Sequence, residues 1–350
     1  MRRNLLKTMQ TPEIEPRDHA ILRAIIQDYI ATAAPVSSRA IVRRHGLRMS
    51  AATVRNVMAD LADLGLITQP HASAGRVPTD LGYRLYVDTL LTTQGPSAQE
   101  RQLLAGPPGD HGLAGLLASS SRLLSGLTHH VGVVSAPCLG DTTLEHIEFV
   151  RLDRHRILAI LVSGSNYVQN RIFHTDRDVA EAELARISRH LNERFHGLTL
   201  EEVRKRSATE LRQTREVYYQ LIMEAVREEQ LAPDSATHLL FLDGASTLLD
   251  EPEFDDIDRA RELLAALEER HNLLTLLDRV VEAEGVQVFI GAESRLGKSV
   301  ECSVVAAKYG IEGRVLGAVG VIGPRRMDYA RIIPLVELTS QVVERKLQGV

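Results

Sequence analysis

The sequence predicts an α+β protein of several domains. Its 350 residues exceed the length of a typical single domain. Near the N-terminus, apolar residues recur at helical spacing between capping residues, and two short strand patterns follow. In the last third, strands and amphipathic helices come in an order typical of an antiparallel α+β domain.

Two helices are expected before residue 46. Asp18 to Thr32 carries apolar residues at helical spacing and predicts the first helix. Ser37 or Ser38 can cap the second, which runs through Arg44 until Gly46 breaks it. The first helix is expected to pack behind the second and the third.

A third helix is expected to begin after Ser50, whose hydroxyl can accept a hydrogen bond from an unpaired backbone N–H. Gly65 lies where a left-handed residue ends many helices. Two helices joined by a short turn in this way predict a helix-turn-helix. The apolar stripe of the third helix consists of Val54, Val57, Met58, Leu61 and Leu64.

The opposite face of the third helix suits close approach to the major groove of double-stranded DNA. Small residues lie there beside Thr53, Arg55 and Asn56. Arg and Asn side chains can each make two hydrogen bonds to base edges, and a recognition helix presents its N-terminal turns to the bases. We therefore predict that these three residues contact bases. The alternative is an ordinary amphipathic hairpin whose polar face is only solvated.

A two-stranded wing is expected after the third helix. Leu66 to Gln69 predicts one strand, Ala74 to Pro78 predicts its antiparallel return, and 70–73 is rich in turn formers. Helix, turn, helix and wing is the winged-helix order. Ser73 and Arg76 are predicted to contact phosphates. Against this, many hairpins carry one arginine that has no such role.

Charge is distributed unevenly along the chain. Residues 1–90 contain 12 Lys or Arg and 8 Asp or Glu, a net charge of +4, whereas the rest of the chain has a net charge of −9. Phosphate contacts require local positive charge, whatever the overall charge of the protein. The residues predicted to position phosphates are Arg39, Arg43, Arg44, Ser50, Ser73 and Arg76.

The bulk composition excludes several classes of protein. Hydrophobic residues make up 44% of the chain, which is enough for buried cores. The two cysteines, Cys138 and Cys302, lie far apart, which argues against a disulfide scaffold and against a zinc site. No apolar run approaches the roughly 20 residues of a membrane span, and no signal peptide is evident. We therefore expect a cytoplasmic protein.

A further helix and a linker are expected after the wing. Asp80 is expected to cap a helix that runs through Leu91. The segment 92–112 contains TTQGPS and GPPGDHG, a composition typical of linkers, and predicts a domain boundary. A helix over 113–127 and a strand over 131–134 follow.

The middle of the chain predicts a three-stranded antiparallel meander over 146–152, 157–162 and 167–173. Two helices are expected next, over 178–196 and 208–231. These elements look like a separate insertion into the surrounding domain.

The last third predicts a strand, helices, three strands and a helix in that order, which indicates an antiparallel sheet in an α+β module. The expected strands cover 238–242, 286–290, 303–307 and 315–322; the expected helices cover 257–281, with a break near 270–272, and 328–347.

No arrangement of residues predicts catalysis, a cofactor or a metal site. Gly291–Ser299 resembles a phosphate loop, but five rather than four residues separate its glycines, and a strand pattern follows instead of a helix. The 13 histidines show no metal-ligand spacing. Gly323–Tyr329 is expected to form a structural corner. Contact of Arg325 and Arg326 with a ligand or another domain is the alternative.

Several segments resemble the HrcA family of heat-inducible transcription repressors. In chain order they are SSRAIVRRHGLRMSAATVRNVMADLADLGLI, HASAGRVPTDLGYRLYVD, LNERFHGLTLEEV, FLDGASTLLDEPEFDDI and YGIEGRVLGAVGVIGPRRMDYARIIPLV. They extend over nearly the whole chain, whereas 93–112 and the termini contribute little.

The resemblance implies a fold and a function. The fold is a winged helix over 1–92, a GAF-like domain formed by 93–139 (with the linker) and 236–350, and a dimerisation domain inserted over 140–235. The implied function is that of a homodimer which represses chaperone operons by binding the inverted repeat called CIRCE, with the chaperonin promoting its active state. The matching wing and recognition-helix positions are carried over as DNA contacts.

Three other functions remain open at this point. A winged-helix regulator that senses a small molecule through the GAF-like domain would show reciprocal coupling between ligand and operator. An enzymatic relative of GAF domains would need a catalytic constellation, which the sequence does not predict. A purely structural dimer scaffold would show no salt-dependent affinity for DNA.

Overall fold

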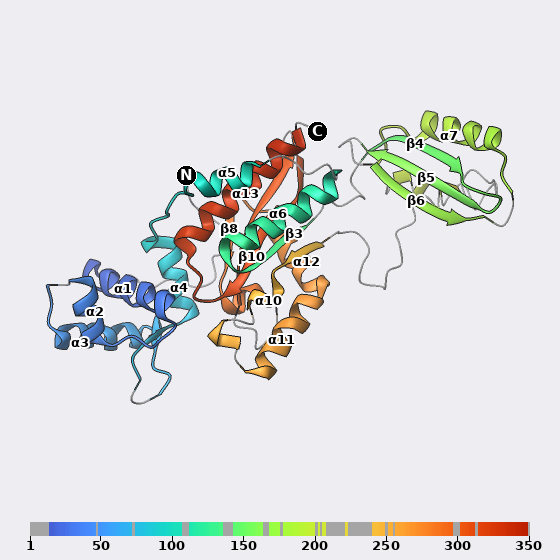
Figure 1. The fold of residues 1–350 in the computed structure, drawn as a ribbon. Helices are drawn as coiled ribbons and strands as arrows, with labels where there is room; N and C mark the ends of the chain where they lie inside the picture. The colour runs from blue at the N-terminus through green and yellow to red at the C-terminus, as the bar shows by residue number, and fades with distance from the viewer. Residues whose placement is uncertain are drawn as a thin grey trace. The chain divides into compact units, whose positions relative to one another are not determined.

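The computed structural model has two compact units and a mixed α+β architecture, as the sequence predicts (Figure 1). The first unit is built from Met1–Gly109, Leu116–Ser135 and Leu240–Lys346, and most of the second from Ala136–Leu239. The structure describes residues 14–46, 48–71, 74–106, 112–135, 143–163, 168–175, 178–199, 202–203, 205–207, 221–222, 240–248, 251–254, 256–296, 302–311 and 314–348.

The first unit begins with three helices and a ribbon of two short strands, which together with the following helix we call the head (Pro16–Leu90). Buried apolar side chains of the three helices form its core, which confirms the amphipathic patterns. The elements are α1 (Pro16–Thr32), α2 (Ser38–His45), α3 (Ala51–Asp63), β1 (Ile67–Thr68) and β2 (Val77–Pro78).

The ends of α3 follow local sequence signals with one exception. Ser50 caps its start, and Gly65 adopts a left-handed conformation with φ 72° just past its end, both as predicted. The prediction that Leu64 belongs to the buried stripe is wrong, because Leu64 is 41% exposed. The helix ends at Asp63, so the chain turns away from the helix line there and Leu66 takes the buried place.

The ribbon pairs as predicted and also makes a contact that the sequence did not predict. Thr68 lies opposite Val77 in an antiparallel pair. Val36, just before α2, exchanges two backbone hydrogen bonds with Arg76, at 2.9 and 2.8 Å. The ribbon is therefore fastened to the start of α2.

The helix after the ribbon is α4 (Asp80–Leu85), which continues as a π-helical turn, η1 (Tyr86–Leu90). The prediction that Asp80 caps it is wrong. Thr79 is the cap, and its hydroxyl accepts a first-turn backbone N–H at 3.1 Å. The carboxylate of Asp80 instead accepts a hydrogen bond from Arg325 at 2.8 Å.

The predicted linker over 92–112 is partly wrong, because it contains a helix, α5 (Ala98–Ala105). Ser97 and Glu100 form a capping box at its start. Arg331 donates a hydrogen bond to Glu100 at 2.8 Å, which helps lower the pKa of that carboxyl to about 2. This helix is thus tied to the C-terminal part of the first unit.

The rest of the first unit, which we call the body, is built on a five-stranded antiparallel sheet with the order β7-β3-β10-β9-β8. One strand precedes the second unit in the chain and the other four follow it, so in the sequence the second unit is inserted between strands of one sheet. The strands agree with the predicted ones and are β3 (Val131–Ser135), β7 (Leu240–Asp243), β8 (Val286–Phe289), β9 (Cys302–Ile311) and β10 (Arg314–Pro324).

Helices cover both faces of the body sheet (Figure 1). Alternate strand residues point to opposite faces, and one set packs against α11 (Ile257–Glu268) and α12 (Arg270–Val281). The other set faces α6 (Gly112–Thr128) and α13 (Tyr329–Gln348). The predicted break between the first two helices occurs at Glu269.

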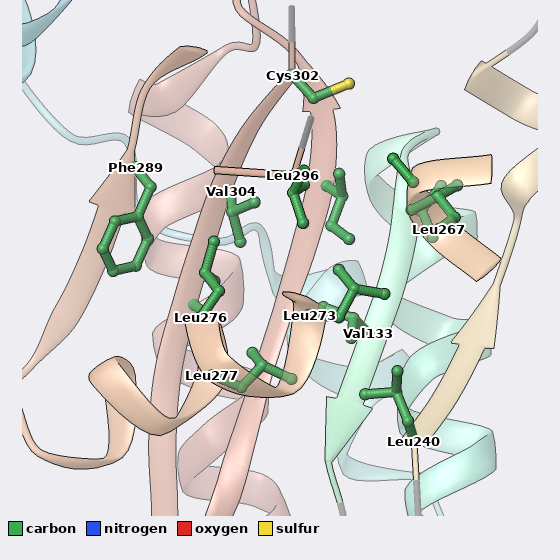
Figure 2. Packing of buried hydrophobic residues seen from close by; sticks show 14 of the residues in the cluster. Val133, Leu240, Leu267, Leu273, Leu276, Leu277, Phe289, Leu296, Cys302 and Val304 are labelled. Carbon is green, nitrogen blue, oxygen red and sulfur yellow. The ribbon is translucent and has the colours of Figure 1, made fainter. Parts of the chain in front are cut away.

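The core on the α11 and α12 side consists of aliphatic side chains with two aromatic rings, those of Phe254 and Phe289, and one thiol (Figure 2). Cys302 is fully buried there, as expected for a small core residue. The residues labelled in this core are Val133, Leu240, Leu267, Leu273, Leu276, Leu277, Phe289, Leu296, Cys302 and Val304.

The second unit contains the predicted meander, a three-stranded sheet with the order β4-β5-β6. Its strands are β4 (Leu144–Arg151), β5 (Arg156–Ser163) and β6 (Val168–His174), and α7 (Glu181–Phe195) follows. The predicted helix over 208–231 lies almost entirely outside the described residues.

Helix α7 occupies the outer edge of β4. Asn192 accepts the Ile147 N–H at 2.7 Å and donates to the Ile147 carbonyl at 2.9 Å. Ser188 accepts the Phe149 N–H at 3.1 Å. The edge of β4 therefore has side-chain partners where an edge strand would leave its backbone groups open.

Candidate nucleic-acid interface

The exposed face of α3 brings together the three residues predicted to contact bases. Ser50 Oγ accepts the Thr53 N–H at 3.0 Å and lies 2.9 Å from the Thr53 hydroxyl, which fixes the first turn. Arg55 and Asn56 are exposed, and Thr53 is half-exposed. Among the described residues, the side chains of Arg55 and Asn56 have no hydrogen-bond or ion-pair partner. Their donors and acceptors are available to a ligand.

Helix α2 carries three arginines at the surface, one of which forms an ion pair within the head. Ser37 caps the helix by accepting the Ala40 N–H at 3.2 Å, so the earlier of the two candidate caps is the one used. Arg39 and Arg43 are exposed. Arg44 is also exposed, but it forms an ion pair with a residue of α1. The three arginines of α2 that are predicted to position phosphates are thus all at the surface.

Asp28 is the buried partner in this ion pair, and sequence reasoning missed it. Its two carboxylate oxygens contact Arg44 at 3.1 Å and His45 at 3.0 Å. It lies three residues after Ile25 and seven after Ile21, on the buried side of α1. An acidic residue within an apolar stripe was the available signal, since such a group needs a partner.

Both the backbone and the side chain of Arg76 have partners. Its backbone pairs with Val36, and its guanidinium donates a hydrogen bond to the Gln69 side chain. Gln69 in turn donates to the Ala74 carbonyl at 2.9 Å. The sequence predicted a role for Arg76 but not for Gln69, which orients it. Ser73, the other predicted contact at this tip, lies outside the described residues.

The rest of the described chain offers few candidates for other chemistry. No three His, Cys, Asp or Glu side chains in the described ranges are grouped so that they could hold a metal ion. None of the helices there combines the length and the apolar composition that crossing a membrane requires. The exposed polar face of α3 and the adjoining basic residues are therefore the candidate site.

Comparison with known proteins gives similarity over nearly the whole length. The family model described as the HrcA protein C terminal domain matches residues 114–333. The heat-inducible transcription repressor HrcA of Geobacter sulfurreducens is 45% identical over 341 residues, which cover 96% of this chain and 99% of that protein. The repressor of the same name from Xanthomonas axonopodis pathovar citri is 41% identical over 347 residues, covering 98% and 99%.

A solved structure shows the same fold. The crystal structure of a hypothetical protein matches with a TM-score of 0.66 at 24% identity, covering 96% of this chain and 99% of that one.

Proposed function

The chain belongs to the HrcA family of heat-inducible transcription repressors, and on this premise we propose that its head is a winged helix-turn-helix that binds double-stranded operator DNA. The observation that carries the proposal is the capped start of α3, where Arg55 and Asn56 are exposed and unpaired. Thr53, Arg55 and Asn56 read base edges in the major groove.

Basic and hydroxyl side chains around α3 position the DNA backbone. Arg39, Arg43 and Arg44 on α2 are at the surface beside the recognition helix. Arg76 on the ribbon contacts a phosphate or the adjacent minor groove, as a wing does. Phosphate contacts of this kind fix register without reading sequence. The remaining members of this set are Ser50 and Ser73.

We further propose that the repressor acts as a homodimer on the inverted repeat called CIRCE. A two-fold DNA site calls for a two-fold protein with one head for each half-site. The second unit offers a surface for this contact, because the outer face of its sheet carries a row of apolar side chains. Val150, Leu158 and Ile172 lie side by side across β4, β5 and β6, and Val150 and Ile172 are 38% and 57% exposed.

In this proposal the body is a GAF-like domain into which the second unit is inserted as the dimerisation domain. The order of strands around the insertion supports it, since β3 and β7 are neighbours in one sheet although the second unit separates them in sequence. The chaperonin modulates the repressor in the cytoplasm, where the operators are. Repression requires occupancy of DNA and no catalytic step.

A binding experiment tests the proposal. Full-length protein is titrated against a CIRCE-type palindrome, a scrambled duplex and a single half-site at two salt concentrations. We expect tightest binding to the palindrome and a marked loss of affinity at higher salt. A variant with Arg55→Ala and Asn56→Ala is expected to lose the preference for the palindrome.

Arg261→Ala is the matched control, because Arg261 is an exposed arginine on α11 of the body. Equal affinity of the wild-type protein for palindrome and scrambled duplex would contradict the proposed function.

A further inference from the structure

Two segments that look like ligand sites in the sequence converge on one helix of the head. Gly291–Ser294, the start of the segment resembling a phosphate loop, forms a 3-10 turn called η4. Gly323–Tyr329 is the corner between β10 and α13. Both contact the first turns of α4 through Asp80 and Arg84.

Asp80 occupies the position where an anion would lie. Its carboxylate accepts a hydrogen bond from Arg325 at 2.8 Å and from the Ala292 N–H at 3.2 Å. Gly291 has φ 51°, and a Cβ there would come within 2.2 Å of the Asp80 carboxylate. Glycine is therefore required at this point, both for the left-handed backbone and for the close approach.

Arg84 makes a second connection one helical turn later. Its guanidinium donates to Glu293 at 3.1 Å through Nε, again to Glu293 through Nη2, and to the Val288 carbonyl at 2.6 Å. Glu293 is itself oriented, because it accepts the Ile290 N–H at 3.0 Å. Arg84 is 14% exposed, so Glu293 is needed to compensate for the burial of its charge.

Burial would lower the pKa of Arg84, but the hydrogen bonds and the charge of Glu293 outweigh it and raise the pKa. A forked guanidinium bound by two oxygens of one carboxylate and one carbonyl defines an orientation as well as an attraction. In addition, the rings of Tyr83 on α4 and Tyr329 of the body are 6.1 Å apart. These contacts form a specific joint between α4 and the body.

We infer that Asp80 and Arg84 are positioning residues for operator binding, which hold the recognition helix at a fixed angle to the body. Helix α4 begins directly after β2, and the ribbon is fastened to the start of α2, so the position of α4 determines the position of α3. This inference rests on the proposed function. Two heads that are correctly placed bind a palindrome more tightly than either head binds alone, and lost geometry removes that gain.

The test uses charge exchange in the full-length protein. Arg84→Glu and Glu293→Arg each place like charges at the joint, and the double variant restores an opposite pair. Each is titrated against the palindrome and against a single half-site. Hydrogen exchange of the segments Asp80–Leu85 and Gly291–Ser294 reports opening of the joint without DNA.

We expect each single variant to lose about tenfold or more in affinity for the palindrome and to keep its half-site affinity. Exchange should rise in both segments, and the double variant should recover on both measurements. Asp80→Asn is a milder variant with the same shape. It is expected to change both measurements in the same direction and serves if a charge reversal prevents folding.

Unchanged exchange in the single variants would overturn the inference, as would raised exchange with an unchanged preference for the palindrome. Parallel loss of palindrome and half-site affinity would also overturn it, because the head itself would then be altered. If the wild-type protein bound neither duplex, the proposed function would fail. Raised exchange in the variants would then still show that these residues hold α4 to the body.

Discussion

Helices α3 and α4 belong to the same head and each carries an arginine in its first turns, but the two arginines have opposite surroundings. Arg55 on α3 is exposed and has no partner among the described residues. Arg84 on α4 is mostly buried and donates to Glu293, Asp88 and the Val288 carbonyl. Arginine thus provides free hydrogen-bond donors on α3, whereas on α4 it attaches the helix to the body.

The difference explains how one small unit can both bind a partner and hold its place. An unpaired arginine at a surface contributes little to folding, but it can form hydrogen bonds with bases or phosphates. A buried, paired arginine contributes to a defined geometry, and removing its partner leaves an uncompensated charge. Substitutions on α3 should therefore alter DNA affinity but not stability, whereas those at the joint should alter stability and, through the placement of the head, the affinity for the palindrome.

The largest expected effect is on stability at the joint. Arg84→Ala should lower the free energy of unfolding by about 3–4 kcal/mol, near the lower limit for a broken buried pair because Glu293 is 30% exposed. Urea denaturation of wild type and variant measures it. Arg261→Ala, which removes an exposed arginine, should change the value by less than about 0.5 kcal/mol. Equal effects of the two substitutions would remove the contrast between the buried arginine and the exposed one.

A buried histidine beside the joint should make stability depend on pH. Burial, with the nearby charge of Arg326, lowers the pKa of His130 to about 4. The folded pKa lies below the unfolded value of about 6.5, so the stabilisation is complete above pH 6.5 and is lost as pH falls towards 4.

The loss amounts to about 3 kcal/mol over that range. Denaturation at a series of pH values should show it in the wild-type protein and not in His130→Asn. The Arg55→Ala protein, changed only on the open face of α3, should keep the same pH dependence as the wild type.

Arg55→Ala, unlike Arg84→Ala, should change DNA binding and leave stability unaltered. It is expected to weaken operator binding by about 1–3 kcal/mol and to relax specificity at one base position. The free energy of unfolding should stay within about 0.5 kcal/mol of wild type. An equal loss of affinity for operator and random duplex would assign Arg55 to phosphate contact instead of base contact.

The smallest expected effect concerns the ribbon, where Arg76 is both held by a protein partner and proposed to contact DNA. Gln69→Ala removes the acceptor that orients the guanidinium and should weaken DNA binding by about 1 kcal/mol, equally on operator and scrambled duplex. Gln69→Glu keeps an acceptor for Arg76 but loses the donor to Ala74, and should retain most of the affinity. Equal losses in the two variants would show that orientation of Arg76 is unimportant.

The features that the sequence predicted correctly are local. Ser50 caps α3 through a backbone group three residues away, and the apolar stripe of that helix needs only its own spacing. The strands of the body sheet were found from short apolar runs bounded by turns. The exposed position of Arg55 and Asn56 follows from the same helical period.

The features that were missed depend on distant or competing partners. Arg84 and Glu293 are 209 residues apart in the chain, and one sequence does not show that they meet. Thr79 and Asp80 are both good caps, and the pull of Arg325 on Asp80 decides between them. In the predicted linker, the flanking Pro and Gly residues outweighed a capping box that was present in the sequence.

The blocked edge of β4 has a consequence for how many molecules can assemble. Asn192 and Ser188 already satisfy the backbone groups of Ile147 and Phe149 there, so another copy cannot add a strand on that side. A chain of molecules growing by strand addition needs two open sides on every member. With one side closed, growth through this sheet stops after the first pairing.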